Sequence, residues 1–136
     1  MVIRLPIVPP TATSQFGSRR LNWVGGKPRF FKSARQKDTE HTLRSLLLEH
    51  RPEKPMSGPV RVSIVFVWPH TRSTPKRLLA KTLPLANRPD LDNLGKALLD
   101  VMTQLQFWFD DGQIQQLSLS KWRAPEGELL IEVEPA

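Results

Sequence analysis

Cysteine is absent from this 136-residue chain. The absence excludes thiol catalysis, zinc sites built on thiolates and disulfide frameworks together, because all of them need the cysteine sulfur. The chain also has no Gly-x-Ser-x-Gly nucleophile elbow and no phosphate-binding P-loop spacing. Its three histidines are scattered without a metal-ligand spacing. The sequence therefore argues against the commonest covalent and zinc chemistries.

Long apolar runs are lacking as well. No stretch approaches the ~18–20 apolar residues of a membrane span, and the apolar N-terminal stretch is interrupted by prolines and too short for a signal peptide. We therefore expect a cytoplasmic protein. A chain of this length can bury enough surface to form one core without a disulfide or a metal. We expect a single domain that spans residues 1–136.

Acidic residues are the minority charge. Lys and Arg total 20 against 13 Asp and Glu, which gives a formal net charge of +7 and a pI near 10.4. A domain this basic is typical of nucleic-acid binding, although acidic partners or lipid headgroups would also attract it.

The charges are also segregated along the chain. Residues 19–37 and 70–88 are rich in Lys and Arg and contain no acidic residue, whereas Asp and Glu gather between 90 and 111 and near the C-terminal end. Two basic segments thus flank an acidic centre. We expect the basic segments to hold DNA through its phosphates, with the contacts made by Arg19, Arg20, Lys27, Arg29, Arg72, Lys76, Arg77, Lys81 and Arg88.

The pattern of apolar and turn residues predicts an α+β fold. Alternation is strongest from Val60 to Trp68, which predicts a strand with both faces largely buried. Apolar residues at helical spacing predict helices over 34–50 and 91–105. Further strands are expected over 2–8, 113–122 and 129–134, and a hairpin around Gly25-Gly26. We expect a mixed sheet of about four to five strands with the two helices packed on it.

The stretch that carries chemistry reads RPDLDNLGK over residues 88–96. If the chain is extended after Pro89, Asp90 and Asp92 present their carboxylates on one side. Lys96 lies four residues after Asp92, and Asp100 four further, so these three share a face of the predicted helix. A second acidic pair, Asp110-Asp111, follows the helix directly after Phe107-Trp108-Phe109.

A structural interpretation of both acidic pairs is open at this point. Asp90 could cap the helix, Asp92 could favour its first turn, and Lys96 could bridge neighbouring carboxylates. Asp110-Asp111-Gly112 could be a plain turn. Trp68 and Trp108 have apolar neighbours, so core packing is expected of them rather than base stacking.

Metal chemistry gives a reason to prefer a functional interpretation. Mg²⁺ takes oxygen ligands, usually one or two carboxylates together with water and substrate phosphates. Carboxylates beside a phosphodiester would repel it, and a bound cation reverses that effect. Such an ion activates water and neutralises developing charge, and a nearby lysine adds positive charge for the same purpose. This interpretation requires acidic side chains from two separate turns to converge in space.

Two blocks of the sequence resemble the signature blocks of the RusA family of Holliday-junction resolvases. They are residues 88–97, RPDLDNLGKA, and residues 107–114, FWFDDGQI, in the family's order and at a matching separation. The likeness is strong over 88–114 and looser over the following hairpin and the first strand. Members of that family are small homodimeric endonucleases, often encoded by phages, that use Mg²⁺.

The resemblance implies roles for individual residues. Asp90, Asp92 and Asp111 match the metal-binding catalytic carboxylates, and Lys96 matches a lysine that assists catalysis. Asp110 matches another acidic neighbour of lesser importance. Mn²⁺ is an expected substitute for Mg²⁺.

The function implied is resolution of four-way DNA junctions by paired nicks, carried out by a homodimer in a bacterial cell or by a phage-encoded enzyme. Two other functions account for part of the sequence. A non-catalytic nucleic-acid-binding protein would explain the charge and leave the carboxylates as caps and turns. A metal-dependent phosphatase for small esters would explain the carboxylates without the basic segments.

Overall fold

The strongest alternating segment of the sequence becomes the central strand of the molecule. The computed structural model describes residues 1–11, 19–32 and 34–136. Within that part of the chain the elements follow the order β1 (Val2–Leu5), β2 (Arg19–Val24), β3 (Lys27–Lys32), α1 (Ala34–Leu48), β4 (Val60–Pro69), η2 (Lys76–Leu78), β5 (Leu83–Pro84), α2 (Leu91–Gln104), η3 (Asp111–Gln113), β6 (Ile114–Ala124) and β7 (Glu128–Pro135).

The described strands form a five-stranded mixed sheet and a separate hairpin. The strand order in the sheet is β1-β7-β4-β6-β5, and β2 pairs with β3 around Gly25 and Gly26. β4 runs parallel to β6 and antiparallel to β7. Parallel neighbours need a long crossover, and the connection from β4 to β6 contains α2. The α+β class, the mixed sheet and the hairpin are confirmed; β5 was not predicted.

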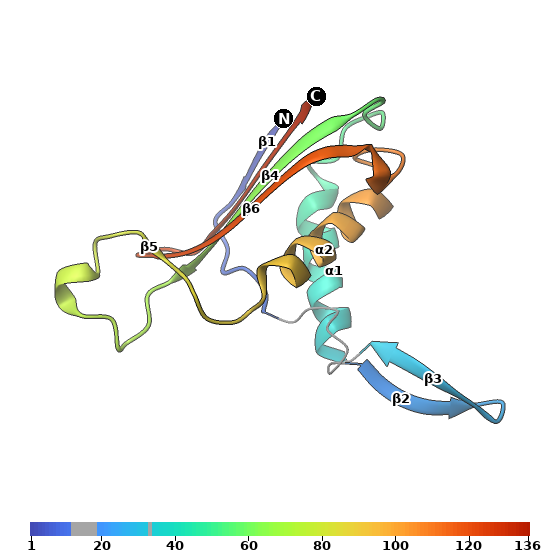
Figure 1. Cartoon of the computed structure of the whole chain (residues 1–136), viewed down its shortest axis with the longest axis horizontal. Coiled ribbons are helices and arrows are strands. Elements are labelled where there is room, and N and C mark those ends of the chain that lie inside the picture. Colours follow the sequence, from blue (N-terminus) through green and yellow to red (C-terminus); the bar gives the residue numbers. More distant parts are fainter. Residues whose placement is uncertain (12–18, 33) are drawn as a thin grey trace.

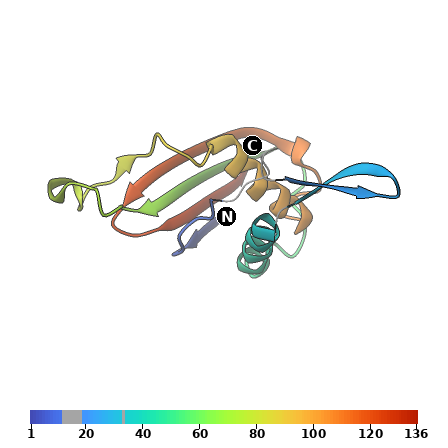
Figure 2. The ribbon, with the colours of Figure 1, turned by 90° about the horizontal axis from the view of Figure 1, so that it is seen from below.

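Both helices cover the same face of the sheet, as Figures 1 and 2 show from two directions. The apolar stripe of α2 is buried there, as its helical spacing predicts. The prediction that Trp68 and Trp108 pack in the core is confirmed, since they are 5% and 0% exposed. Phe107 is fully buried beside Trp108, so the chain between α2 and β6 is anchored by two aromatic side chains.

Gly95 allows α2 to approach β6 closely. A Cβ atom built on Gly95 would lie 2.5 Å from a methyl carbon of Leu119, which is closer than van der Waals contact permits. The side chain of Leu119 therefore points toward α2, and so does every second side chain along β6. This contact fixes the position of the N-terminal half of α2 over the sheet.

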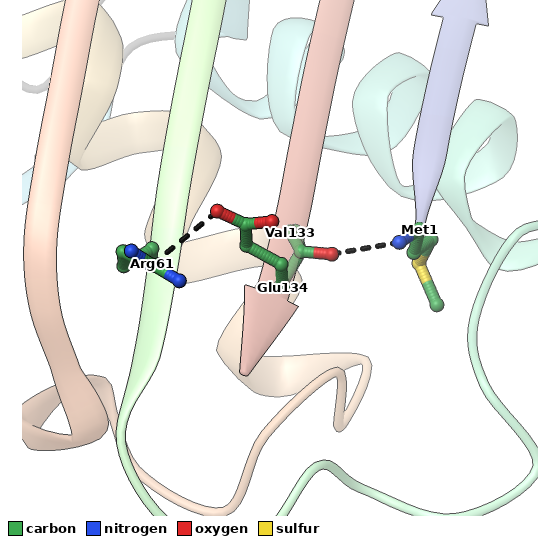
Figure 3. A network of polar contacts seen from close by, with 4 residues as sticks. All are labelled: Met1, Arg61, Val133 and Glu134. Atoms are coloured by element: carbon green, nitrogen blue, oxygen red, sulfur yellow. Dashed lines mark hydrogen bonds and ion pairs between the residues drawn. The ribbon is translucent and has the colours of Figure 1, made fainter. Parts of the chain in front are cut away.

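The opposite face of the sheet is polar near the chain ends. The N-terminal amine of Met1 donates to the carbonyl of Val133 at 2.8 Å, and Arg61 Nε lies 3.3 Å from Glu134 Oε1 (Figure 3). These contacts join β1, β7 and β4 at one end. No helix in the described part of the chain combines the length and apolar character needed to cross a membrane.

Candidate active site

Asp90 begins α2 but does not cap it with its side chain. Its backbone is extended, with φ −69° and ψ 131°, and its carboxylate accepts no hydrogen bond from the backbone of the first turn. The helix starts through the main chain instead, where Leu94 N donates to Asp90 O at 3.1 Å. The carboxylate lies 3.5 Å from Asn93 Nδ2. Asp90 is extended as expected, but Asp92 is already helical, so the extended stretch that was expected to set both carboxylates on one side ends at Asp90. The side-chain capping interpretation of Asp90 is wrong.

Asp92 lies in the first turn of α2 and is exposed to solvent. It contacts no polar group among residues 1–11, 19–32 and 34–136. Lys96, one turn further on, is paired with Asp100 at 3.7 Å and not with Asp92. The side chains of Lys96 and Asp100 are 65% and 45% exposed, so this ion pair contributes little to stability. Asp92 and Lys96 are therefore available to a ligand.

Lys121 is a residue of this site that the sequence analysis did not identify. It lies on β6, and its Nζ donates to the carbonyls of Asn87 at 2.5 Å and Pro89 at 2.9 Å. These bonds tie β6 to the residues that precede Asp90. The alternation of Leu117, Leu119 and Lys121 placed the lysine on the helix-facing side of its strand, which was the available signal.

The second acidic pair divides into two different roles. Asp110 caps η3, where its Oδ1 accepts a hydrogen bond from Gly112 N at 2.7 Å. Gln113 Oε1 accepts in return from Asp110 N at 3.0 Å, which completes a capping box. The carboxylate of Asp111 is exposed and, within the described residues, has no partner. The turn interpretation therefore holds for Asp110 and leaves Asp111 for other chemistry.

One chain does not bring the three carboxylates together. Asp90 and Asp92 lie at the N-terminal end of α2, and Asp111 follows its C-terminal end. A helix of 14 residues is about 21 Å long, and Figure 1 shows β6 beginning beside the end of α2 that is distant from its N-terminus. In the described ranges no three acidic or histidine side chains form a group able to hold a metal. Within one chain the two acidic turns therefore lie apart, and the shared metal site expected of Asp90, Asp92 and Asp111 stays a prediction.

Gln113 holds the turn that contains Asp110 and Asp111 against the segment before β4. Its Nε2 donates to the carbonyls of Met56 at 2.9 Å and Gly58 at 2.8 Å, just before β4 begins. Lys121, by contrast, lies seven residues after Ile114, the first residue of β6, and it binds the loop before Asp90. Seven residues of a strand cover about 23 Å. The two turns thus flank opposite ends of β6 as well as of α2.

The expected DNA contacts fall on two projections. Arg19 and Arg20 lie on β2, and Lys27 and Arg29 on β3. The rest lie in the connection from β4 to α2, where all are exposed: Arg72, Lys76, Arg77, Lys81 and Arg88. Figures 1 and 2 place the hairpin and this connection at opposite ends of the longest axis, with the N-terminal end of α2 between them. The acidic centre is therefore flanked by basic segments in space as in sequence.

Comparison with known proteins identifies the family of this site. The model of the family described as endodeoxyribonuclease RusA matches residues 7–134. The chain belongs to the RusA family of endodeoxyribonucleases. A protein of Lactococcus phage r1t, named crossover junction endodeoxyribonuclease rusA, is 30% identical to it over 126 residues, or 91% of this chain and 88% of the phage protein.

Membership of the RusA family confirms the resemblance seen in the two sequence blocks. It makes this chain a nuclease, which decides against a non-catalytic binding protein and against a phosphatase for small esters. Nucleases of the family generally depend on a divalent metal. The donor set at the N-terminal end of α2 suits such an ion, because two carboxylates, water and phosphate are the usual ligands of Mg²⁺.

Proposed function

We propose that this RusA-family chain resolves four-way DNA junctions by paired nicks, as a homodimer that uses Mg²⁺, with Mn²⁺ as a substitute. The chain would act as one domain, residues 1–136, in the cytoplasm of a bacterial cell or as a phage-encoded enzyme of DNA recombination and repair. The observation that carries the proposal is the placement of Asp90 and Asp92 at one helix end between two basic projections.

Each residue of the proposed site has a distinct role. Asp90 and Asp92 would hold the ion, with Asp111 as a third carboxylate. Bound there, Mg²⁺ would supply an activated water and neutralise charge on the scissile phosphate. Lys96, whose pair with Asp100 is exposed and weak, would turn toward the phosphate as it enters and add positive charge there. Lys121 would keep the loop before Asp90 in place through its two carbonyl contacts.

The basic segments would bind the arms of the junction. A net charge of +7 per chain favours DNA of any sequence through phosphate contacts, and each contact contributes about 0.9 to the slope of log affinity against log salt. Selection of a branch would then depend on geometry, because two sites related by a twofold axis match a junction of similar symmetry.

A cleavage assay tests the proposal. The substrates are a synthetic four-way junction, a fork and a linear duplex of the same sequence, each with Mg²⁺ and with EDTA. We expect paired nicks in the junction with Mg²⁺ or Mn²⁺, and no cutting in EDTA. Equal cutting of the linear duplex, or cutting in EDTA, would contradict the proposal.

A further inference from the structure

The connection from β4 to α2, residues 70–88, is fixed to the sheet at its base. His70 N donates to Ala124 O at 3.0 Å, and Leu85 N donates to Lys121 O at 3.2 Å. Between these two contacts β5 pairs with β6 near the C-terminal end of that strand. Both sides of the β4–α2 connection are therefore held by the end of β6 that also binds the loop before α2.

The outer part of the connection is held by hydrogen bonds of its own. His70 Nε2 donates to Lys81 O at 2.8 Å and so joins the outgoing and the returning side. Around η2, Leu78 N donates to Pro75 O at 2.9 Å and Lys81 N donates to Leu78 O at 3.0 Å. Pro75 also fixes its own φ directly before η2. As Figures 1 and 2 show, η2 lies at the outer end of a preorganised projection.

The outer end of this projection combines positive charge with an exposed apolar side chain. Lys76, Arg77 and Lys81 are exposed there, and residues 70–88 include no acidic residue. Leu79 lies among these cations, directly after η2, and is 43% exposed. It belongs neither to the hydrophobic core nor to the apolar residues packed against the core. A single exposed leucine is ordinary, but this one stands at the end of a cationic projection that is fixed at its base.

DNA offers a binding place for an apolar side chain that is surrounded by cations. DNA-binding proteins with basic surfaces often insert such a side chain, leucine among them, between neighbouring bases and interrupt their stacking. In a continuous duplex this insertion costs free energy, and the cost is lower where the bases are already unstacked or unpaired. The centre of a four-way junction is a place of that kind. The neighbouring cations would meet the phosphates of the adjoining arm.

We propose that Leu79 is a wedge that enters the branch point of the DNA junction and thereby favours branched over linear DNA. The inference rests on the proposed function, because it concerns how that enzyme selects its substrate. The connection that carries Leu79 leads directly into Asp90 and Asp92, so a branch held by Leu79 is presented to the proposed catalytic end of α2. Selectivity then has a source within each chain, in addition to the symmetry of a dimer.

Binding measurements in EDTA, where the DNA stays uncut, separate an apolar wedge from a phosphate contact. Leu79→Ala shortens the side chain and leaves the charge unchanged. Junction affinity should therefore fall by about tenfold, whereas the affinity for linear duplex and the slope of log affinity against log salt should keep their parental values. Leu79→Met keeps an apolar side chain of similar volume and should restore most of the loss.

Leu48→Ala is the matched control, because Leu48 is another exposed leucine, 50% exposed at the end of α1. This variant should bind junction and linear duplex as the parent does. An equal loss of junction affinity in Leu79→Ala and Leu48→Ala would overturn the inference, and so would an equal loss for junction and linear duplex in Leu79→Ala.

Unstacking at the branch is observed directly with 2-aminopurine, a fluorescent base whose emission rises when it leaves the stack. The base is placed at the branch point of one junction and within an arm of another. At saturating protein we expect the parent and Leu48→Ala to raise emission from the branch-point base alone, and Leu79→Ala to raise it much less. Equal emission with Leu79→Ala and the parent would overturn the inference and leave the proposed function standing. A parental enzyme that fails to cut a junction would overturn both.

Discussion

Aspartates lie near both ends of α2, but their side chains differ in their hydrogen bonds to the backbone. At the N-terminal end the helix starts through the main chain, so the carboxylates of Asp90 and Asp92 have no capping role. Beyond the C-terminal end, Asp110 is committed to the backbone of η3, whereas its neighbour Asp111 is not. Of two adjacent carboxylates in one motif, one is thus bound to the backbone and the other is left exposed to solvent.

The largest expected effect is at the N-terminal end of α2. Asp92→Asn keeps the shape of the side chain and removes its charge, so junction cleavage should fall by about 100-fold or more, since a metal contributes several kcal/mol to such a reaction. Junction binding should be kept or tightened, because a negative charge beside the phosphates is lost.

Asp38→Asn is the matched control for that substitution, because Asp38 is exposed on α1. Single-turnover cleavage and gel-shift binding would be measured for both variants and the parent. If Asp92→Asn cut a four-way junction as fast as Asp38→Asn, the proposed catalytic role of Asp92 would be contradicted.

The next largest effect is expected on junction binding, from the basic connection between β4 and the N-terminal end of α2. Reversing the charges of Arg72, Lys76 and Arg77 to Glu should weaken junction binding by about tenfold or more and lower the salt slope by up to about three, at roughly 0.9 per phosphate contact. The measurement is binding affinity over a range of salt concentrations. An unchanged slope would place the DNA away from this connection.

A smaller effect is expected from Lys121→Met, which removes both contacts to the loop before Asp90. Loss of hydrogen bonds from a charged donor should cost about 1.5–3 kcal/mol of stability. Cleavage should fall more than binding, because the loop leads directly into Asp90 and carries only one of the nine expected DNA contacts, Arg88. Lys54→Met, at an exposed position, is the control. Equal unfolding midpoints in denaturant would show that Lys121 does not anchor the loop.

The smallest expected effect is a difference in stability between variants of Asp110 and Asp111. Asp110→Ala removes the cap of η3 and should lower the free energy of unfolding by about 1 kcal/mol. Asp111→Ala removes an exposed side chain with no described partner, so stability should change by less than about 0.5 kcal/mol. Denaturant unfolding of the two variants measures the difference. The reverse order of stabilities would contradict the division of roles.

Much of the fold could be predicted because it depends on local patterns. The alternation of β4, the apolar stripe of α2 and the Gly25-Gly26 turn are each visible within a short window of sequence. β5 has two residues and exists only through its pairing with β6, so no local pattern indicated it. The role of Lys121 depends on strand register, which is a long-range property.

The sequence indicated which carboxylates were candidates for the site, but not how they lie relative to one another. Sequence order placed Asp111 shortly after α2, but it did not show whether the turn after the helix would return to Asp90 or stay at the far end of the helix. The direction of α2 is set by close packing of Gly95 on Leu119, a contact between residues far apart in the chain. The sequence therefore indicated which carboxylates could act together, but not that the two turns lie apart within one chain.

The most direct test of the account is a crystal structure of the full chain grown with Mn²⁺, in which the ion is located by its anomalous scattering. We expect one peak at the N-terminal end of each α2, in contact with Asp90 and Asp92. A peak on the Asp110-Asp111 turn alone, or no peak near Asp90 and Asp92 at saturating Mn²⁺, would contradict it.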